Sequence, residues 1–296
     1  MSIDLHIHSN CSDGKMTIEE IFKEASQRGI NVISITDHDS IECQEHAKLL
    51  ADQYRIQYIY GLELNVSFSH PDYNNSKPVS LDFLAYQYDI YNRPLIEKLD
   101  SLREFRKKRA QTILEKINLE FRREDIPEFT DKDMKEIEDS VDGAFGRPHI
   151  ADYMVKKGIV SSRQKAFDKY LVKCNVPKMP LSLEEASELV KGAGGSLILA
   201  HPNNPRGTSL VALTDEIGEQ QRIIKESMIN YINGVECWHS SHNEKTTDSY
   251  LSFAKDMGIM VTGGSDCHQQ PVIMGTLKIP YYVVQQFGIN LNNIQQ

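Results

Sequence analysis

Short apolar runs alternate with amphipathic stretches along the first ninety residues of the chain and again after about residue 180. This alternation is typical of strands that are linked by helices. Thr17-Ile18-Glu19-Glu20 forms a capping box, which opens a helix that stops at Gly29. A further helix is expected from Ser40 to about Tyr54, and another from about Glu244 to Met257. The pattern predicts seven core strands, at residues 3–7, 32–35, 56–68, 79–86, 196–200, 234–238 and 259–262.

The stretch from Arg93 to Pro180 interrupts this alternation, because it is charged and helical and carries no strand pattern. Its basic patches, such as Lys107-Lys108-Arg109, are expected to be solvated helix faces rather than a nucleic-acid surface. We therefore predict an inserted helical subdomain at residues 93–179, which could act as a lid, within an α/β domain of residues 1–92 and 180–296. The strand count favours a parallel barrel over an open sheet, with the polar loop 70–76 closing a hairpin.

Histidines and carboxylates gather where the apolar runs end. They form six clusters: Asp4-Leu5-His6-Ile7-His8, Ser12-Asp13-Gly14, Thr36-Asp37-His38-Asp39, Gly61-Leu62-Glu63, Leu199-Ala200-His201-Pro202 and Gly264-Ser265-Asp266-Cys267-His268. Imidazole nitrogens and carboxylate oxygens hold Zn, Mn or Fe in hydrolytic sites. One such pair can be a buried histidine that is bonded to a backbone carbonyl. Six clusters at strand ends instead predict a multinuclear metallohydrolase, because the ends of parallel strands converge on one mouth.

Composition narrows the possible partners. The chain has 296 residues, a net charge of −9 and a pI of about 5.6, which argues against a broad basic track for long duplex DNA or RNA. The net negative charge is still compatible with a small anionic substrate, because bound divalent ions can make the local electrostatic field positive. No apolar run reaches the ~18 residues of a membrane span, and we expect a cytoplasmic protein. Five cysteines without a Cys-x-x-Cys pair indicate neither a disulfide framework nor a zinc ribbon, and Cys11 and Cys267 are expected to be small buried side chains.

The combination D-L-H-I-H-S-x-C-S-D-G, I-T-D-H-D, G-L-E, A-H-P and G-S-D-x-H resembles the PHP family, named for polymerase and histidinol phosphatase domains. The resemblance covers residues 3–86 and 180–275 and is strongest to stand-alone bacterial phosphoesterases. These include nucleotide 3′-phosphatases, short-RNA exonucleases and cyclic-phosphate hydrolases. The resemblance implies a distorted (β/α)7 barrel with a helical insertion after the fourth strand. Its motifs are specific for the family but not for a substrate.

The resemblance also implies a centre of two or three divalent ions of Mn, Zn or Fe. In this assignment the first ion is bound by His6, His8, Glu63 and Asp266; the second by Glu63 and His201; and the third by Asp13, His38 and His268. The family usually places a further histidine on the fourth strand, where this chain has Asp82. Asp82 could ligate the second ion and favour Mn, or it could leave that site weak or empty. His70 is a possible substitute, although we expect it to be a solvent-exposed loop residue.

Substrate recognition is expected to need cationic donors beside the metals. Related phosphatases carry an Arg-x-His that resembles Arg147-Pro148-His149, and a guanidinium offers phosphate a bidentate fork. The alternative is a helix-start arginine paired with a surface acid. His242 matches a family histidine and could contact phosphate or protonate the leaving group, whereas His239 is a weaker candidate and Trp238 is expected in the core. Asp37 and Asp39, on either side of His38, are expected to orient ligand imidazoles.

These expectations give a metal-dependent phosphoesterase that acts on a small phosphorylated metabolite, a nucleotide or a short oligonucleotide end. A hydroxide bridging the first two metals would attack phosphorus, with Glu63 holding both metals and Arg147 stabilising the developing charge. The leaving alcohol would take its proton from His242 or from a metal-bound water, and the sequence does not decide between them. The alternatives are hydrolysis of histidinol phosphate or of a cyclic sugar phosphate, and a non-catalytic metal-binding regulatory module.

Overall fold

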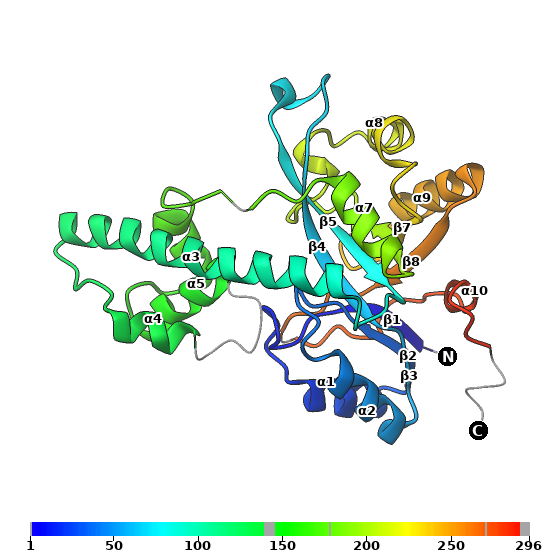
Figure 1. The fold of residues 1–296 in the computed structure, drawn as a ribbon, viewed down its shortest axis with the longest axis horizontal. Helices are drawn as coiled ribbons and strands as arrows, with labels where there is room; N and C mark the ends of the chain where they lie inside the picture. Colours follow the sequence, from blue (N-terminus) through cyan, green and yellow to red (C-terminus); the bar gives the residue numbers. More distant parts are fainter. Residues whose placement is uncertain (1, 139–145, 178, 270, 291–296) are drawn as a thin grey trace.

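The computed structural model describes residues 2–138, 146–177, 179–269 and 271–290. The strands are β1 (Ser2–Ile7), β2 (Ile30–Ile35), β3 (Gln57–Tyr58), β4 (Gly61–Phe68), β5 (Val79–Tyr86), β6 (Ser196–Leu199), β7 (Gly234–His239) and β8 (Met260–Gly264). They form two sheets, and with the surrounding helices they give an α/β fold (Figure 1). The described residues 93–177 contain no strand, as the sequence predicts.

The first sheet holds β1, β2 and β3 in parallel. Its connecting helices, α1 (Ile18–Gln27) and α2 (Gln44–Tyr54), lie together below the sheet in Figure 1. The predicted capping box is present: the side chain of Thr17 accepts the N–H of Glu20, and the carboxylate of Glu20 accepts the N–H of Thr17. Helix α2 begins four residues after the predicted Ser40.

The second sheet has the strand order β4-β5-β6-β7-β8. Strands β4 and β5 form the predicted antiparallel hairpin, β5 is also antiparallel to β6, and β6, β7 and β8 are parallel. The parallel arrangement therefore holds at both ends of the chain but not around β5. Two isolated bridges join the sheets, Ile7 to Cys267 and His38 to Glu63, and both involve residues of the predicted clusters or their neighbours.

The predicted strand 56–68 is divided between the two sheets, with β3 in the first and β4 in the second. Gly61 begins β4 where the chain passes against β2, and a Cβ there would collide with the side chains of Ser34 and Thr36. The chain can therefore cross from one sheet to the other only with glycine at this point. This crossing places Glu63 beside the end of β2.

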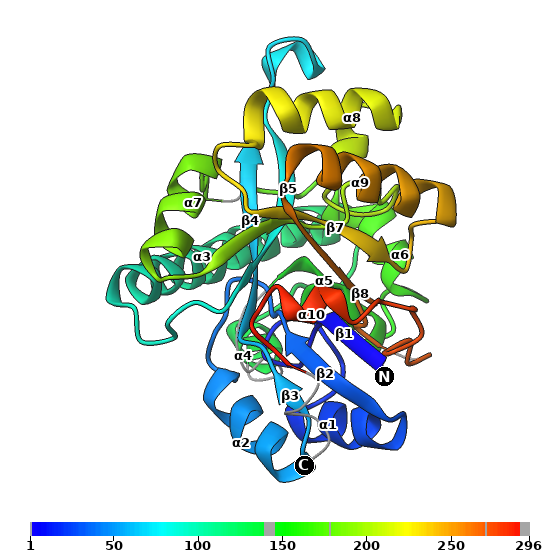
Figure 2. The ribbon, with the colours of Figure 1, turned by 90° about the vertical axis from the view of Figure 1, so that its right-hand side faces the viewer.

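Helices cover the second sheet and form the insertion. The remaining α-helices are α3 (Arg93–Arg123), α4 (Asp131–Glu138), α5 (Arg147–Lys156), α6 (Arg163–Ala166), α7 (Leu183–Gly192), α8 (Ile217–Ile223), α9 (Glu244–Met257) and α10 (Tyr282–Gln285). Helices α7, α8 and α9 lie around the second sheet, whereas α4, α5 and the far half of α3 stand to one side of both sheets (Figures 1 and 2). Buried side chains of the described residues 110–137 and 150–174, among them Ile113, Phe121 and Tyr170, form a hydrophobic cluster of their own.

One disulfide and three free cysteines are present among the described residues. A disulfide joins Cys11 to Cys43, with their Cα atoms 6.4 Å apart, so our expectation that the cysteines form no disulfide is wrong, although Cys11 is buried as expected. Cys267 is free and fully buried, as expected. Among the described residues, no helix has both the length and the apolar character needed to cross a bilayer.

Candidate metal centre

The predicted ligands come from strands and from the loops that follow them. His6 lies in β1 and Glu63 in β4, whereas His38, His201 and Asp266 follow the ends of β2, β6 and β8. Two of these residues have left-handed backbone conformations, with φ of 26° at His201 and 57° at Asp266, and such strain is often kept at functional sites. Eight of the predicted metal ligands lie close together, and we call this group the histidine–carboxylate centre: His6, His8, Asp13, His38, Glu63, His201, Asp266 and His268.

Glu63 lies at the middle of this centre. Its Oε2 is 3.1 Å from His8 Nε2 and also 3.1 Å from His38 Nδ1. Its Oε1 is 3.2 Å from His201 Nε2 and 3.5 Å from His6 Nε2. One carboxylate thus faces four imidazoles, which is the placement expected of a bridging ligand.

Asp266, which follows β8, faces two of the same imidazoles, those of His6 and His8, and also the imidazole of His268. Its Oδ1 lies 3.3 Å from His6 Nε2, 3.2 Å from His8 Nε2 and 3.4 Å from His268 Nδ1. The two Nε2 atoms of His6 and His8 are themselves only 3.2 Å apart. Two imidazole nitrogens that converge between carboxylates fit a shared cation, because their lone pairs otherwise face each other.

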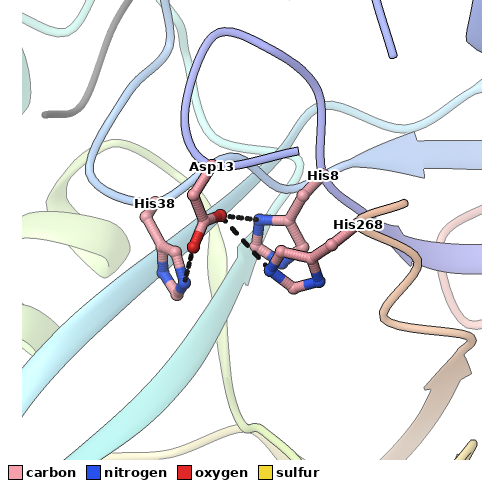
Figure 3. A group of neighbouring side chains, drawn as sticks. All are labelled: His8, Asp13, His38 and His268. Atoms are coloured by element: carbon pink, nitrogen blue, oxygen red, sulfur yellow. Dashed lines mark ion pairs between the residues drawn. The ribbon is translucent and has the colours of Figure 1, made fainter. Parts of the chain in front are cut away.

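Asp13 gathers the third set of ligands, drawn in Figure 3. Its Oδ1 is 3.2 Å from His268 Nε2 and 3.7 Å from His8 Nδ1, and its Oδ2 is 4.0 Å from His38 Nε2. Asp13 sits in the loop after β1, where Gly14 packs so closely on the backbone of His8 that a Cβ would collide. The loop can therefore fold back and place Asp13 over His8.

Burial and charge in this centre oppose each other. Burial lowers the pKa of His6 and His8, but the adjacent carboxylates outweigh it and hold both values well above the ordinary range. Burial raises the pKa of Glu63, Asp266 and Asp13, but the neighbouring imidazoles outweigh burial and hold all three pKa values well below the ordinary range. The buried carboxylates thus require positive charge beside them. The donor set of imidazole nitrogens and carboxylate oxygens fits divalent ions in that role.

Asp82 reaches this centre and His70 does not. Ligand atoms of Asp82, His38 and Glu63 lie within 4.8 Å of one another, so an ion could bind between them. Asn65 fixes Asp82 by donating its side-chain amide to Oδ1 at 2.5 Å. We expected His70 to be solvent-exposed, and this prediction is wrong, because His70 is buried. Its Nδ1 accepts the N–H of Asp72 at 3.2 Å.

Glu236 is a residue of this site that sequence reasoning missed. It is fully buried in β7, its Oε1 accepts a hydrogen bond from His6 Nδ1 at 3.0 Å, and its Oε2 accepts the backbone N–H of His201 at 2.8 Å. A proton held on Nδ1 leaves the Nε2 lone pair of His6 directed into the centre. An acidic residue inside the apolar run Gly234-Val235-Glu236-Cys237 was the available signal.

Asp37 and His239 also support the centre. Asp37 accepts hydrogen bonds from Ser9 N–H, Ser9 Oγ and Ser12 Oγ, at 2.8, 2.6 and 2.5 Å, and so holds the loop before Asp13 rather than an imidazole. His239 is 2% exposed, and the backbone N–H of Ser241 donates to its Nδ1 at 3.1 Å. The proton must then lie on Nε2, which is 3.3 Å from Asp266 Oδ2. His239 therefore holds Asp266 in place as a hydrogen-bond donor.

The proposed substrate residues occupy different places. Arg147 lines a cavity of about 170 Å³ beside Asp13 and His38. His149 accepts the N–H of Gly146 at Nδ1 and lies 2.8 Å from Ser12 O through Nε2, so it ties the insertion to the Asp13 loop.

His242 does not join the histidine–carboxylate centre. Its Nδ1 lies 2.9 Å from Cys237 O, and burial lowers its pKa to about 4. The role of His242 as a proton donor stays a prediction that this geometry does not favour. Trp238 is partly buried and packs against the main hydrophobic core, close to the core position we expected.

Comparison with known proteins matches the sequence pattern of the PHP domain to residues 4–142. A 5′-3′ exoribonuclease of Haemophilus influenzae is 30% identical over 206 residues, which is 67% of this chain and 68% of that protein. A 3′,5′-nucleoside bisphosphate phosphatase of Chromobacterium violaceum is 27% identical over 271 residues, 90% of this chain and 87% of that protein. A crystal structure of a protein from Bifidobacterium adolescentis, which is described as a metal-dependent phosphoesterase, superposes with a TM-score of 0.79 and 26% sequence identity. The superposition covers 98% of this chain and 97% of that protein.

Proposed function

Because the chain belongs to the PHP-domain family of metal-dependent phosphoesterases, we propose that it hydrolyses a phosphate ester of a nucleotide or of a short oligonucleotide end. The two relatives named above act on RNA and on nucleoside bisphosphates according to their names. Nucleotide substrates are therefore favoured over histidinol phosphate and cyclic sugar phosphates. The observation that carries the proposal is the histidine–carboxylate centre, since eight expected ligands from separate strands converge in one place.

The centre fits two or three divalent ions. We propose that His6, His8, Glu63 and Asp266 hold the first; Glu63 and His201 the second; and Asp13, His38 and His268 the third. Asp82, whose carboxylate lies beside His38 and Glu63, is a further candidate ligand of the second ion through its place next to Glu63. When bound, such ions activate a water molecule and offset the charge on the phosphate oxygens. The protein's own groups fix this arrangement: Glu236 holds the tautomer of His6, and His239 holds Asp266.

We further infer that the two sheets close into the distorted (β/α)7 barrel of the family, with residues 93–179 as an inserted subdomain between barrel segments 1–92 and 180–296. Support comes from the two bridges that join the sheets and from the separate hydrophobic cluster around Ile113, Phe121 and Tyr170. The insertion faces the centre, because His149 bonds to Ser12 and Arg147 lines the cavity beside Asp13. A non-catalytic module would not need this arrangement of donors around an accessible cavity.

The proposal is tested by a phosphate-release screen of the purified protein over phosphorylated metabolites, with Mn and with Zn. Nucleoside bisphosphates and short 5′- or 3′-phosphorylated oligonucleotides should be hydrolysed fastest, and chelation should abolish the activity. The variant Glu63→Gln removes the shared ligand and should lose activity on every substrate. Faster hydrolysis of histidinol phosphate or of a cyclic sugar phosphate would replace the nucleotide assignment, and no hydrolysis with any metal would reject the enzyme assignment.

A further inference from the structure

A disulfide joins the two chain segments that carry Asp13 and His38, both of which belong to the third set of ligands. Cys11 lies in the loop after β1, two residues before Asp13, and Cys43 immediately precedes α2, five residues after His38. The separation of 6.4 Å between their Cα atoms is within the usual range for disulfides. Cys11 is 3% exposed, whereas Cys43 is only partly buried and is the more accessible sulfur. The disulfide therefore lies where its loss can move a metal ligand.

The segment around His38 is fixed by contacts that do not involve the disulfide. The N–H of Asp39 donates to Glu63 O at 2.9 Å, and the N–H of Glu63 donates to Asp37 O at 3.2 Å. The carboxylate of Asp39 also pairs with Arg106 of the insertion. His38 is thus held against β4 by its neighbours on both sides. Opening the disulfide should leave His38 and Glu63 in place.

The loop that carries Asp13 is held in a different way. Its hydrogen bonds from Ser9 and Ser12 to Asp37 keep it folded, and the N–H of Cys11 donates to Ser9 Oγ at 3.1 Å. These contacts hold the loop to the end of β2, and the disulfide adds a covalent link from the loop to the start of α2. Opening the disulfide should therefore loosen Asp13 without unfolding the loop.

We propose that Cys11 and Cys43 form a site of reversible thiol–disulfide exchange, which sets the affinity of the third set of ligands for its metal ion. With the disulfide formed, the loop holds Asp13 close to His38 and His268 (Figure 3). With two free thiols, the position of Asp13 is less restricted, and the third ion binds more weakly. This inference rests on the proposed function, because it uses the assignment of the third ion, and it adds regulation by thiols to that function.

The exchange needs a thiol reductant, and glutathione serves as the probe. A glutathione thiolate attacks Cys43 Sγ, the disulfide bond breaks, and the electron pair passes to Cys11 Sγ, which takes up a proton. A second glutathione thiolate attacks the glutathione sulfur of the mixed disulfide and releases Cys43, which is protonated in turn. Two glutathione molecules are thereby oxidised to one glutathione disulfide, and the protein gains two electrons and two protons. Glutathione disulfide reverses both steps.

Counting thiols in the wild-type protein is the first test. The chain has five cysteines, and the free ones are Cys174, Cys237 and Cys267. Protein that is equilibrated with glutathione disulfide and then alkylated under denaturing conditions should gain three alkyl groups by mass spectrometry. Protein that is equilibrated with reduced glutathione should gain five. Five alkyl groups at every ratio of the two forms of glutathione would overturn the proposal.

Metal binding is then measured at the same ratios of reduced to oxidised glutathione. Mn in chelator-buffered solution is the suitable ion, because carboxylates favour it whereas thiols favour softer metals. A contact that orients a metal ligand is worth about 10- to 100-fold in affinity. Because the loop keeps its bonds to Asp37, the lower end is expected, so reduction should weaken binding of one Mn ion about tenfold and spare the others. By linkage, that ion should protect the disulfide against reduction by the same factor.

Variants assign the effect to this pair of cysteines. Cys43→Ala and Cys11→Ala should bind the third Mn ion with the affinity of the reduced protein at every glutathione ratio. Cys174→Ala is the matched control, because Cys174 is also 3% exposed but is free, and it should keep the dependence on glutathione. Asp13→Asn removes a ligand of the third set, so it should lose the third ion and the dependence on glutathione together.

The outcomes separate this inference from the proposed function. Equal Mn affinities, within about twofold, in oxidised and reduced wild-type protein would overturn the switch and leave the metal centre standing. A glutathione dependence that persists in Cys43→Ala and Cys11→Ala would also overturn it. Fewer than one bound Mn ion in both states would reject the metal centre, and with it both proposals. The thiol count and the glutathione dependence use the wild type, so they give an answer even where a cysteine variant fails to fold.

Discussion

Replacing Glu236 by glutamine tests how the buried polar contacts control metal binding. In the wild type the carboxylate accepts His6 Nδ1–H at 3.0 Å with one oxygen and the backbone N–H of His201 at 2.8 Å with the other. Glutamine has only one acceptor oxygen, so either orientation sets its amide N–H against one of these buried donors. One unsatisfied buried donor costs about 1–3 kcal/mol.

That loss should appear in metal affinity as well as in stability. Without the carboxylate, the Nδ1 proton of His6 is held less firmly and the Nε2 lone pair is less fixed in its direction. Loss of such a contact to a ligand imidazole lowers metal affinity by about 10- to 100-fold. The assay is metal content by mass spectrometry in chelator-buffered solutions of Mn or Zn, together with denaturant unfolding of the same samples.

Glu97→Gln is the matched control, because Glu97 is 62% exposed and pairs with Arg93 on the surface of α3. It should leave both metal affinity and the free energy of unfolding unchanged. Glu236→Gln with lower stability but with metal affinity within about twofold of the wild type would refute the reasoning. Glu236 would then be a buried structural carboxylate and not a residue that positions metal ligands.

Four further predictions follow from the same geometry. The purified protein should carry two or three transition-metal ions per chain, and fewer than one ion after reconstitution with Mn or Zn would contradict the ligand assignment. Asp82→His should shift metal preference from Mn towards Zn while hydrolysis is retained, whereas unchanged metal content and rate in Asp82→Asn would show that Asp82 is not a ligand. Arg147→Ala should spare metal content and reduce hydrolysis of phosphorylated nucleotides more than that of p-nitrophenyl phosphate, and no loss on either would show that the insertion does not contact the substrate. In metal-free protein, burial lowers the pKa of His201, but the adjacent Glu63 outweighs burial and raises that pKa from 6.5 to about 9. The stability gained from this proton should therefore be complete below pH 6.5 and should be lost as the pH rises through 9. Free energies of unfolding in urea that do not depend on pH across this range would contradict the prediction.

The sequence predicts the elements well where local signals decide the structure. Helix α9 spans the expected Glu244–Met257, with the side chain of Asn243 accepting the N–H of Thr246 at its start. The prediction for residues 56–68 is wrong because a tertiary contact decides it: the close approach of Gly61 to β2 divides one apolar run between two sheets. A run of apolar residues does not show which sheet it will join.

The residues of the candidate site also differ in whether local sequence signals predict them. Ligands at strand ends could be predicted, because the clusters around His6, His38 and Asp266 are visible in the chain. Glu236 was missed because its partner His6 lies 230 residues away. The run Lys107-Lys108-Arg109 predicts a solvated basic patch, which is wrong for Arg109, because that side chain is buried. Arg109 follows the buried Leu102 by seven residues and precedes the buried Ile113 by four. Such helical spacing places Arg109 on the apolar face of α3 and was the available signal for its burial.

The measurement that tests the central claim most directly is phosphate release from adenosine 3′,5′-bisphosphate as a function of bound metal, in wild-type protein and in Glu63→Gln. Glu63 faces His6, His8, His38 and His201, so its loss should disrupt the whole centre. The account predicts that the rate in the wild type rises with metal occupancy and disappears on chelation, and that Glu63→Gln stays folded but releases no phosphate above background. Metal-independent release, or release by folded Glu63→Gln at a rate close to that of the wild type, would contradict it.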